Sequence, residues 1–239
     1  MSFLSVTQEY FSAFLDFIYP QFCSGCEVPL IESETHICMF CQHNLFITEK
    51  KHTKNDTVLL RFAEQPVSRV ISLMRYSKKG SVKEIINKIK YFRDIPLGYY
   101  LGQELGRKII KTNIPYQIDY IIPVPLHPKK LRKRGYNQAE IIAQGVSSVL
   151  HSPICTDTLL KKINNNTQTK KGRISRWKNT EVAYQLQNKN AKKLKGKNIL
   201  LIDDVLTSGA TLTSCIKELS LAEVGMKMVG VLATAENTH

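Results

Sequence analysis

The chain has 239 residues, 43% hydrophobic and 23% charged, which excludes a disordered protein and allows one sizeable core with a small additional module. No apolar run is long enough to span a bilayer, and Glu9 and Asp16 interrupt the N-terminal apolar stretch. We therefore expect a cytoplasmic protein with neither membrane insertion nor a secretory signal. The net charge of +14 favours an anionic partner: nucleic acid, an acidic membrane surface or a phosphorylated small molecule. The alternative is that the lysines only keep the surface soluble.

An N-terminal helix is the first predicted element, because apolar side chains over residues 3–18 recur near helical spacing before Pro20 stops the helix. An aromatic stripe of this kind is more often a docking face than a ligand site. We therefore interpret residues 1–20 as a docking helix that packs the following module against the main domain.

Four of the six cysteines form two CxxC pairs, which eleven residues separate. In a cytosolic chain such pairs indicate a metal site more than disulfides, with free core cysteines or a redox pair as alternatives. Four thiolates complete a tetrahedral zinc shell, so His36 and His43 are not needed and the site is expected to be closed and structural. The zinc module and its linker are predicted over residues 21–66. The expected ligands are Cys23, Cys26, Cys38 and Cys41.

The main domain is predicted over residues 67–239, where apolar strands alternate with amphipathic helices. Strands are predicted at residues 67–76, 118–125, 158–160, 198–203 and 226–235. Helices are predicted at residues 81–89, 97–110, 137–150 and 210–219. This alternation indicates an α/β fold whose parallel sheet has helices on both faces. Cys155 and Cys215 are expected to be small core residues.

The sequence NILLIDDVLTSGATLTSC at residues 198–215 joins a buried strand to an amphipathic helix. We expect Asp203 and Asp204 at the tip of the strand, where open parallel sheets bind their ligands. Paired carboxylates there bind a diol or a divalent cation, while Gly209, neighbouring hydroxyl groups and the helix N-terminus suit a phosphate. This combination predicts a site for a 5′-phosphoribosyl group, against the alternative of an ordinary helix cap. The GxxxxGK and GxGxxG motifs are absent, which argues against a P-loop or a dinucleotide site.

A resemblance to known proteins rests on several motifs. LLIDDVLTSGAT at residues 200–211 closely resembles the phosphoribosyl pyrophosphate (PRPP) motif of type I phosphoribosyltransferases. PVPLHPKKLRKRGYNQAE at residues 123–140, with Gln168, Arg176, Asn179 and the double CxxC, resembles the ComF family of competence-associated proteins. The resemblance covers nearly the whole chain. It implies a Rossmann-like phosphoribosyltransferase domain with an N-terminal zinc finger, linked to the handling of incoming single-stranded DNA in natural transformation.

The resemblance also assigns roles to individual residues. Asp203 and Asp204 would be the catalytic acids that face the ribose hydroxyls, with Mg²⁺ bound alongside PRPP. The 5′-phosphate would be held by Val205, Leu206, Thr207, Ser208, Gly209, Ala210 and Thr211. The pyrophosphate loop would consist of Pro125, Leu126, His127, Pro128 and Lys129. Ser208 keeps the hydroxyl of the threonine usual in type I enzymes, whereas Ser175 replaces the acid that is common in the ComF pattern.

Basic residues gather in three stretches: residues 129–134, residues 161–197, and a cluster near Tyr76. Cationic groups with interleaved aromatic rings suit the backbone and bases of a single strand. The alternative is a solvated loop with its one tryptophan packed in the core. The predicted nucleic-acid-binding residues are Lys130, Arg132, Lys133, Arg134, Tyr136, Arg176 and Trp177.

The function expected from these features is the binding of PRPP or a related phosphoribosyl group, together with single-stranded DNA, during DNA uptake. The alternative is an active Mg²⁺-dependent phosphoribosyltransferase in nucleotide salvage, for which positioning and charge neutralisation would supply the catalysis. A third hypothesis is a scaffold that the zinc module tethers to a helicase-like competence protein. The sequence names no acceptor base.

Overall fold

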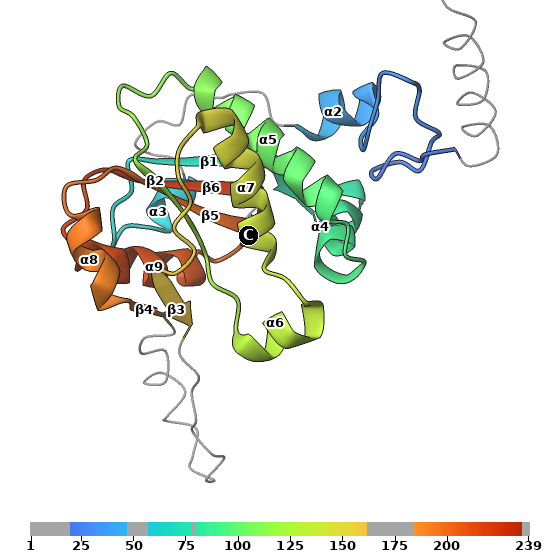
Figure 1. Ribbon diagram of the computed structural model, residues 1–239. Coiled ribbons are helices and arrows are strands. Elements are labelled where there is room, and N and C mark those ends of the chain that lie inside the picture. The colour runs from blue at the N-terminus through green and yellow to red at the C-terminus, as the bar shows by residue number, and fades with distance from the viewer. Residues whose placement is uncertain (1–19, 47–56, 78–79, 162–183, 236–239) are drawn as a thin grey trace, which may run out of the picture.

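The computed structural model describes residues 20–46, 57–77, 80–161 and 184–235 (Figure 1). Within these residues a parallel four-stranded sheet forms the centre, in the order β1-β6-β5-β2. The strands are β1 (Arg69–Tyr76), β2 (Tyr120–Pro123), β5 (Ile199–Leu206) and β6 (Lys227–Ala235). Their nearly continuous apolar sequences are typical of strands that are buried on both faces.

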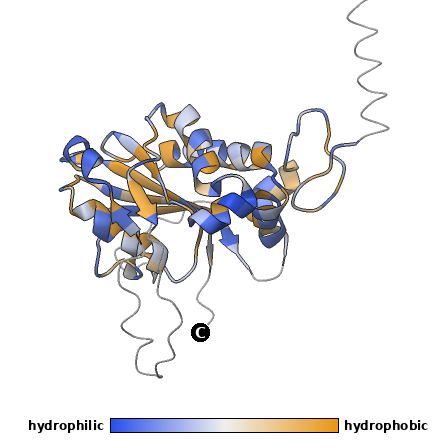
Figure 2. Ribbon diagram, turned by 60° about the horizontal axis from the view of Figure 1, so that its bottom comes forward, coloured by the Kyte–Doolittle hydropathy of each residue, from blue (hydrophilic) through white to orange (hydrophobic). Residues whose placement is uncertain are grey.

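Helices cover both faces of this sheet, and alternate residues of β5 show which helices lie on which face. Leu200 and Ile202 belong to one core cluster with residues of α4, α5 and α7, whereas Ile199 and Leu201 belong to a second cluster with residues of α8 and α9. The helices are α4 (Ser81–Tyr91), α5 (Ile95–Lys111), α7 (Gln138–Leu150), α8 (Asn188–Leu194) and α9 (Ala210–Ser220). Figure 2 shows the hydrophobic strands inside and hydrophilic residues on the outer helices.

Shorter elements surround the sheet. The four cysteines lie around α2 (Met39–Leu45), and α3 (Thr57–Leu60) precedes β1. After β2 the chain forms α6 (Pro128–Arg134). A separate antiparallel pair consists of β3 (Leu159–Lys161) and β4 (Tyr184–Leu186).

The predicted α/β fold, with its parallel sheet and flanking helices, is confirmed. The strands and helices predicted for the main domain are all present, with ends that shift by a few residues. Cys155 and Cys215 are buried, as expected. The docking helix predicted at residues 3–18 lies outside the described residues. No described helix has the length and hydropathy that crossing a membrane requires.

Two features differ from the sequence analysis. Strand β5 continues to Leu206, so Asp203 and Asp204 lie inside the strand and not at its tip. Residues 161–197 were described only as a basic segment, with no strand or helix predicted, but their described part includes β4 and α8. The first difference arises because β6 pairs with β5 as far as Leu206 and keeps the chain extended.

Candidate functional site

The carboxyl end of the sheet has an open edge at β5. Strand β2 pairs with β5 only as far as Pro123 and Ile202, and the Val124 N–H then donates to the Ile202 carbonyl at 2.9 Å. Beyond Ile202, β5 pairs with β6 alone, so its last residues border the loop that leaves β2. We call this region, residues 124–129 and 203–211, the carboxyl edge. The fold therefore brings together the two predicted ligand loops, as parallel strands with adjacent ends require.

The two acids lie next to each other in β5 and consequently face opposite sides of the sheet. On the side of α4, the Asp204 carboxylate forms an ion pair with Lys90, with 3.0 Å between Oδ1 and Nζ. The exposed fractions of these side chains are 15% for Asp204 and 22% for Lys90. A pair this sheltered is stronger than a surface salt bridge, so Lys90 gives the Asp204 side chain a fixed cationic partner.

Asp203 has a different environment. Its Oδ1 accepts the Asp204 N–H at 2.8 Å. Burial and the neighbouring charge of Asp204 raise the pKa of Asp203 to about 7, although Lys90 and Lys161 act in the opposite direction. Near neutral pH this carboxyl group is therefore able to exchange a proton, and a cation bound beside it would favour its ionised form.

The loop between β5 and α9 depends on Gly209. Its φ angle is +88°, and a Cβ at this position would lie 3.1 Å from Cβ of Arg61. The Arg61 guanidinium in turn donates to the carbonyl oxygens of Thr207 and, at 2.8 Å, Ala235. The Thr213 hydroxyl donates to the Arg61 carbonyl at 3.3 Å. Arg61 therefore fixes the ends of β5 and β6 and positions the loop.

Backbone donors remain available in this loop. The Ala210 N–H has a long contact of 3.4 Å with Oγ of Ser208. Within the described part of the chain, the N–H groups of Ser208 and Gly209 make no hydrogen bond to the protein. They lie at the N-terminus of α9, where backbone N–H groups and the helix dipole attract anions.

The second ligand loop is held by its own side chains. His127 caps α6, and its Nδ1 accepts the Lys129 N–H at 3.1 Å. Asn137 donates from Nδ2 to the Val124 carbonyl at 3.1 Å, and the Tyr136 hydroxyl donates to the carbonyl of Ile89. These bonds tie the segment after β2 both to the sheet and to α4. Part of the sequence that resembles the ComF family therefore shapes the loop.

The β3–β4 pair adds a lysine near the acids. Lys161 donates from Nζ to the Tyr184 hydroxyl at 2.9 Å, and Nζ lies 4.8 Å from the centre of the Tyr184 ring. Burial and the charge of Lys130 lower the pKa of Lys161, while Cys215 and Asp203 raise it. Lys161 is thus a sheltered cation on the Asp203 side of the sheet.

The four cysteines predicted as metal ligands come together. Their Sγ atoms all lie within 4.8 Å of one another. The N–H groups of Gly25 and Cys38 donate to Sγ of Cys23 at 3.3 Å each, and the Cys41 N–H donates to Sγ of Cys38 at 3.4 Å. Burial raises the pKa of Cys23, but the backbone N–H donors of Cys38, Cys26 and Gly25 outweigh it and lower the pKa to about 7. The cluster has the geometry and the donor set to hold a metal ion.

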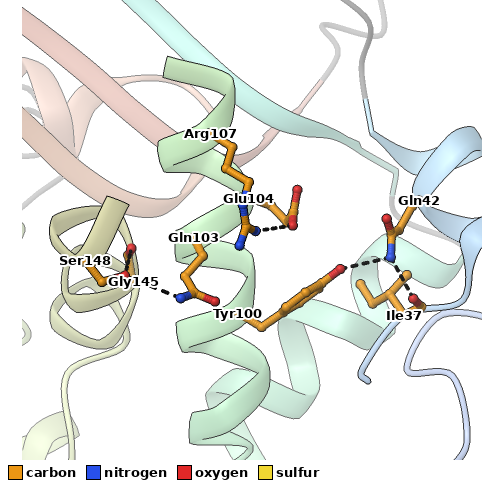
Figure 3. Close-up of polar contacts among 8 residues, drawn as sticks. All are labelled: Ile37, Gln42, Tyr100, Gln103, Glu104, Arg107, Gly145 and Ser148. Carbon is orange, nitrogen blue, oxygen red and sulfur yellow. Dashed lines mark hydrogen bonds and ion pairs between the residues drawn. The ribbon is translucent and has the colours of Figure 1, made fainter. Parts of the chain in front are cut away.

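The segment that carries the cysteines is docked on α5 through polar and aromatic contacts, and Figure 3 shows the polar contacts of Gln42 with Tyr100 and Ile37. Gln42 donates from Nε2 to the Tyr100 hydroxyl and to the Ile37 carbonyl, both at 3.0 Å. The rings of His36 and Tyr100 are 5.3 Å apart. Cys23, Ile37, Cys38 and Cys41 also belong to the core cluster on this face of the sheet. We call residues 20–46 the four-cysteine module.

A family model for the phosphoribosyl transferase domain matches residues 92–239 of the chain. The chain belongs to this family. Competence protein ComFC of Bacillus subtilis strain 168 is 27% identical over 80% of this chain and 74% of its own length. Competence protein F of Haemophilus influenzae is 23% identical over 89% of both chains, and DNA utilization protein YhgH of Escherichia coli O157:H7 is 24% identical over 80% and 87%. The predicted resemblance to the ComF family of competence-associated proteins is confirmed.

The residues predicted to bind nucleic acid differ in their exposure to solvent. Lys130, Arg132 and Lys133 are exposed on α6. Arg134 is partly buried, and its guanidinium lies 5.1 Å from the centre of the Tyr91 ring. Tyr136 is partly buried and its hydroxyl is bonded, so stacking on its ring stays a prediction. Arg176 and Trp177 lie outside the described residues.

Sequence reasoning missed three residues of the phosphoribosyltransferase domain and its surroundings: Arg61, Lys90 and Lys161. Each acts on residues that are distant along the chain, and no spacing in the sequence links them to the carboxyl edge. Lys161 was included only as one member of a long basic segment. Tertiary contacts were needed to find them.

Proposed function

We propose that this protein binds PRPP or a related phosphoribosyl group at the carboxyl edge and holds single-stranded DNA beside it, as part of DNA uptake. One observation supports the binding of a phosphoribosyl group: next to a pair of acids, two backbone donors at the N-terminus of α9 make no hydrogen bond to any of the residues that the structure describes. The relatives named for competence and DNA utilization support the second half.

The proposed ligand would use both loops of the edge. Ser208 and Gly209 would donate their N–H groups to the 5′-phosphate, and the hydroxyl groups of Thr207 and Thr211 would add further donors. The segment 125–129 would face the pyrophosphate. Mg²⁺, which prefers carboxylate and phosphate oxygens, would be held between the pyrophosphate and the edge and would neutralise its charge.

The two acids would have unequal roles towards the ribose hydroxyls. Asp204 is already paired with Lys90, so it would accept a hydroxyl hydrogen bond while the ion pair holds its side chain in place. Asp203 carries the raised pKa and would gain a favourable partner from a hydroxyl group or a cation. Because the acids face opposite sides of the sheet, the ligand would lie across the open end of β5.

Isothermal calorimetry with PRPP and Mg²⁺ tests this site. The double variant Asp203→Asn/Asp204→Asn should bind PRPP at least about tenfold more weakly, because each amide offers the ligand no charge. Asp119→Asn is the matched control, since Asp119 immediately precedes β2 and pairs with Lys197 at 3.2 Å. If the double variant binds PRPP as well as the wild-type protein does, the site is wrong.

An active phosphoribosyltransferase is the second candidate, favoured by the raised pKa of Asp203 and by the sheltered cation of Lys161. Release of pyrophosphate from PRPP and Mg²⁺ in the presence of purine and pyrimidine bases would detect turnover. PRPP binding without pyrophosphate release from any base would favour a binding protein over the enzyme.

The four-cysteine module is proposed to hold a structural zinc ion, because four cysteine ligands leave no position open for water. A cytoplasmic location and a helicase-like partner for this module belong to the same proposal. Pull-down with and without residues 1–50 tests the partner.

A further inference from the structure

We propose that Tyr91 and Phe92, at the end of α4, form a base-stacking platform for single-stranded nucleic acid. This inference deepens the DNA-binding half of the proposed function and rests on it. It assigns the stacking role to two rings that the sequence analysis did not single out.

The platform is defined by exposure that folding does not explain. Tyr91 is 64% exposed and Phe92 is 75% exposed. Large aromatic side chains contribute to stability when they are buried, so two adjacent rings in solvent are informative. Ile95, the first residue of α5, is 40% exposed as well.

The rings are presented by a tightly fixed turn. The Phe92 N–H donates to the Lys88 carbonyl at 3.1 Å and closes α4. Asp94 then caps α5 by accepting the Leu97 N–H at 3.1 Å. Between them Arg93 adopts a φ of +57°, a left-handed conformation that is uncommon for a residue other than glycine. The turn therefore fixes the backbone that presents both rings to solvent, which lowers the ordering cost of binding.

A cationic group lies against one of the rings: the Arg134 guanidinium is 5.1 Å from the centre of the Tyr91 ring. Lys88 and Arg93 come from the same segment as the two rings. The turn also packs on the end of α6, since a Cβ at Gly135 would lie 2.8 Å from Nη2 of Arg93. The exposed basic residues of α6 thus continue the same surface.

Of the acids near this segment, Asp204 is engaged by Lys90. Asp94, the carboxylate within the turn, is used for helix capping, and Glu84 lies in the first turn of α4, away from its end. A surface that combines exposed rings with cations complements a chain that alternates bases with phosphates. An acidic protein as the partner would also complement the cations, but it would not explain why two adjacent rings are exposed.

The platform adjoins the candidate ligand site. Lys90 immediately precedes Tyr91 and pairs with Asp204 of the carboxyl edge. A strand that stacks on Tyr91 and Phe92 would therefore pass beside the phosphoribosyl site. Tyr136 is less suited to stacking, because it is partly buried and its hydroxyl is bonded to Ile89.

The test measures the binding of fluorescein-labelled oligothymidylate, about 20 nucleotides long, by anisotropy at low salt with the full-length protein. Tyr91→Ala/Phe92→Ala should bind this strand at least about tenfold more weakly than the wild-type protein, because base–aromatic stacking is lost. Tyr91→Phe/Phe92→Tyr keeps both rings and should bind like the wild-type protein. Leu221→Ala is the control for loss of exposed apolar surface, since Leu221 is 70% exposed and follows α9.

A second strand of equal length with abasic sites separates stacking from charge. The wild-type protein should bind the abasic strand about as weakly as the alanine variant binds oligothymidylate. The platform is overturned if the alanine variant binds oligothymidylate like the wild-type protein, or if the alanine substitutions weaken binding to both strands equally. A wild-type protein that binds neither strand but still binds PRPP overturns the DNA half of the proposed function as well, and leaves the phosphoribosyl site standing.

Discussion

The four-cysteine module and the carboxyl edge hold their functional groups in opposite ways. In the module, α2 buries only Cys41, and the cysteines themselves form much of the interior. At the carboxyl edge, a sheet with two core clusters positions the acids, and Arg61 and Asn137 fix the loops by hydrogen bonds. One site makes its own local structure, whereas the other is carried by a fold that exists without it.

This difference indicates what each ligand would do for the protein. A metal in the module would supply binding free energy that is also folding free energy. A phosphoribosyl ligand would find groups already in place. It would offset part of the free-energy cost of burying the Asp203 carboxyl group, because it would give that group a hydrogen-bond partner. Removing the metal should therefore change the structure of the four-cysteine module. Removing PRPP should leave the structure of the carboxyl edge unchanged.

The largest expected effect comes from the metal ligands. Cys41→Ser should abolish metal binding, because it removes one of the four ligands. The loss is large, since structural zinc sites supply about 10–16 kcal/mol of folding free energy in small domains. Residues 20–46 should lose hydrogen-exchange protection, while the strands of the sheet keep theirs. Metal content by mass spectrometry and exchange rates measure both. Cys155→Ala is the control, since this buried cysteine lies outside the cluster. Retention of one metal ion per chain in the Cys41 variant would contradict the assignment.

The second prediction concerns the folding stability that is lost when the buried Asp203 carboxyl group ionises. Its pKa is raised from 3.8 to about 7 in the folded protein, so the native state prefers the protonated form. Ionisation therefore lowers stability progressively as pH rises from about 4 to about 7, and the cost is constant above that. Asp203→Asn removes the charge and should stabilise the protein at pH 8 by up to roughly 4 kcal/mol, since one pKa unit is about 1.4 kcal/mol.

Urea unfolding of the Asp203→Asn variant and the wild-type protein at several pH values measures this cost. The advantage of the variant should be largest near pH 8 and should shrink towards pH 4. Asp119→Asn provides the contrast: the Asn198 N–H and Lys197 lower the pKa of Asp119, so its loss should destabilise the protein above the ordinary carboxyl pKa. A stability difference for Asp203→Asn that does not vary with pH would refute the raised pKa.

The sequence was sufficient for the parts of the fold that depend on local pattern. The apolar stretches of β1, β2, β5 and β6 and the periodic faces of α5 and α9 follow directly from residue spacing. Helix α6 could not be found in this way, because it is short, rich in lysine and arginine, and has no buried residue. Strand β4 has only three residues, too few to show an alternating pattern, so it is recognised only by its pairing with β3.

The two sites differ in the same respect. The cysteine cluster was predictable because ligands of one ion recur at fixed spacing. The acids and the following loop were predictable as a motif, but their environments were not. Lys90 reaches Asp204 from α4, and the Tyr91–Phe92 platform depends on an exposure that composition alone does not reveal. Contacts between distant segments decide these features.

The third prediction separates backbone strain from ligand binding at the carboxyl edge. Gly209→Ala should lower stability by about 1–3 kcal/mol, because its φ of +88° disfavours a side chain and its Cβ would crowd Arg61. PRPP affinity should fall as well, since the Ser208 and Gly209 donors would shift. Gly196→Ala is the matched control, because Gly196 has a φ of +70° with no atom within 4 Å of its would-be Cβ. Equal losses of PRPP affinity in both variants would show that the loop geometry is not used.

The smallest expected effect concerns the contact that joins the two regions. Gln42 donates to the Tyr100 hydroxyl at 3.0 Å, and burial raises the pKa of Tyr100 to about 12, so the phenol stays neutral. Tyr100→Phe leaves the ring beside His36 but removes the acceptor, which should cost about 1 kcal/mol. Tyr99→Phe is the control on the exposed side of α5.

Hydrogen exchange resolves where that small cost falls. In the Tyr100→Phe variant, exchange should become faster in residues 36–46 while metal content and PRPP affinity stay unchanged, because the cysteine ligands and the carboxyl edge are intact. Faster exchange at β5 as well would mean that the module supports the carboxyl edge, and the separation between the two regions would then fail. Unchanged exchange everywhere would show that apolar packing through Ile37, and not this hydrogen bond, holds the module on α5.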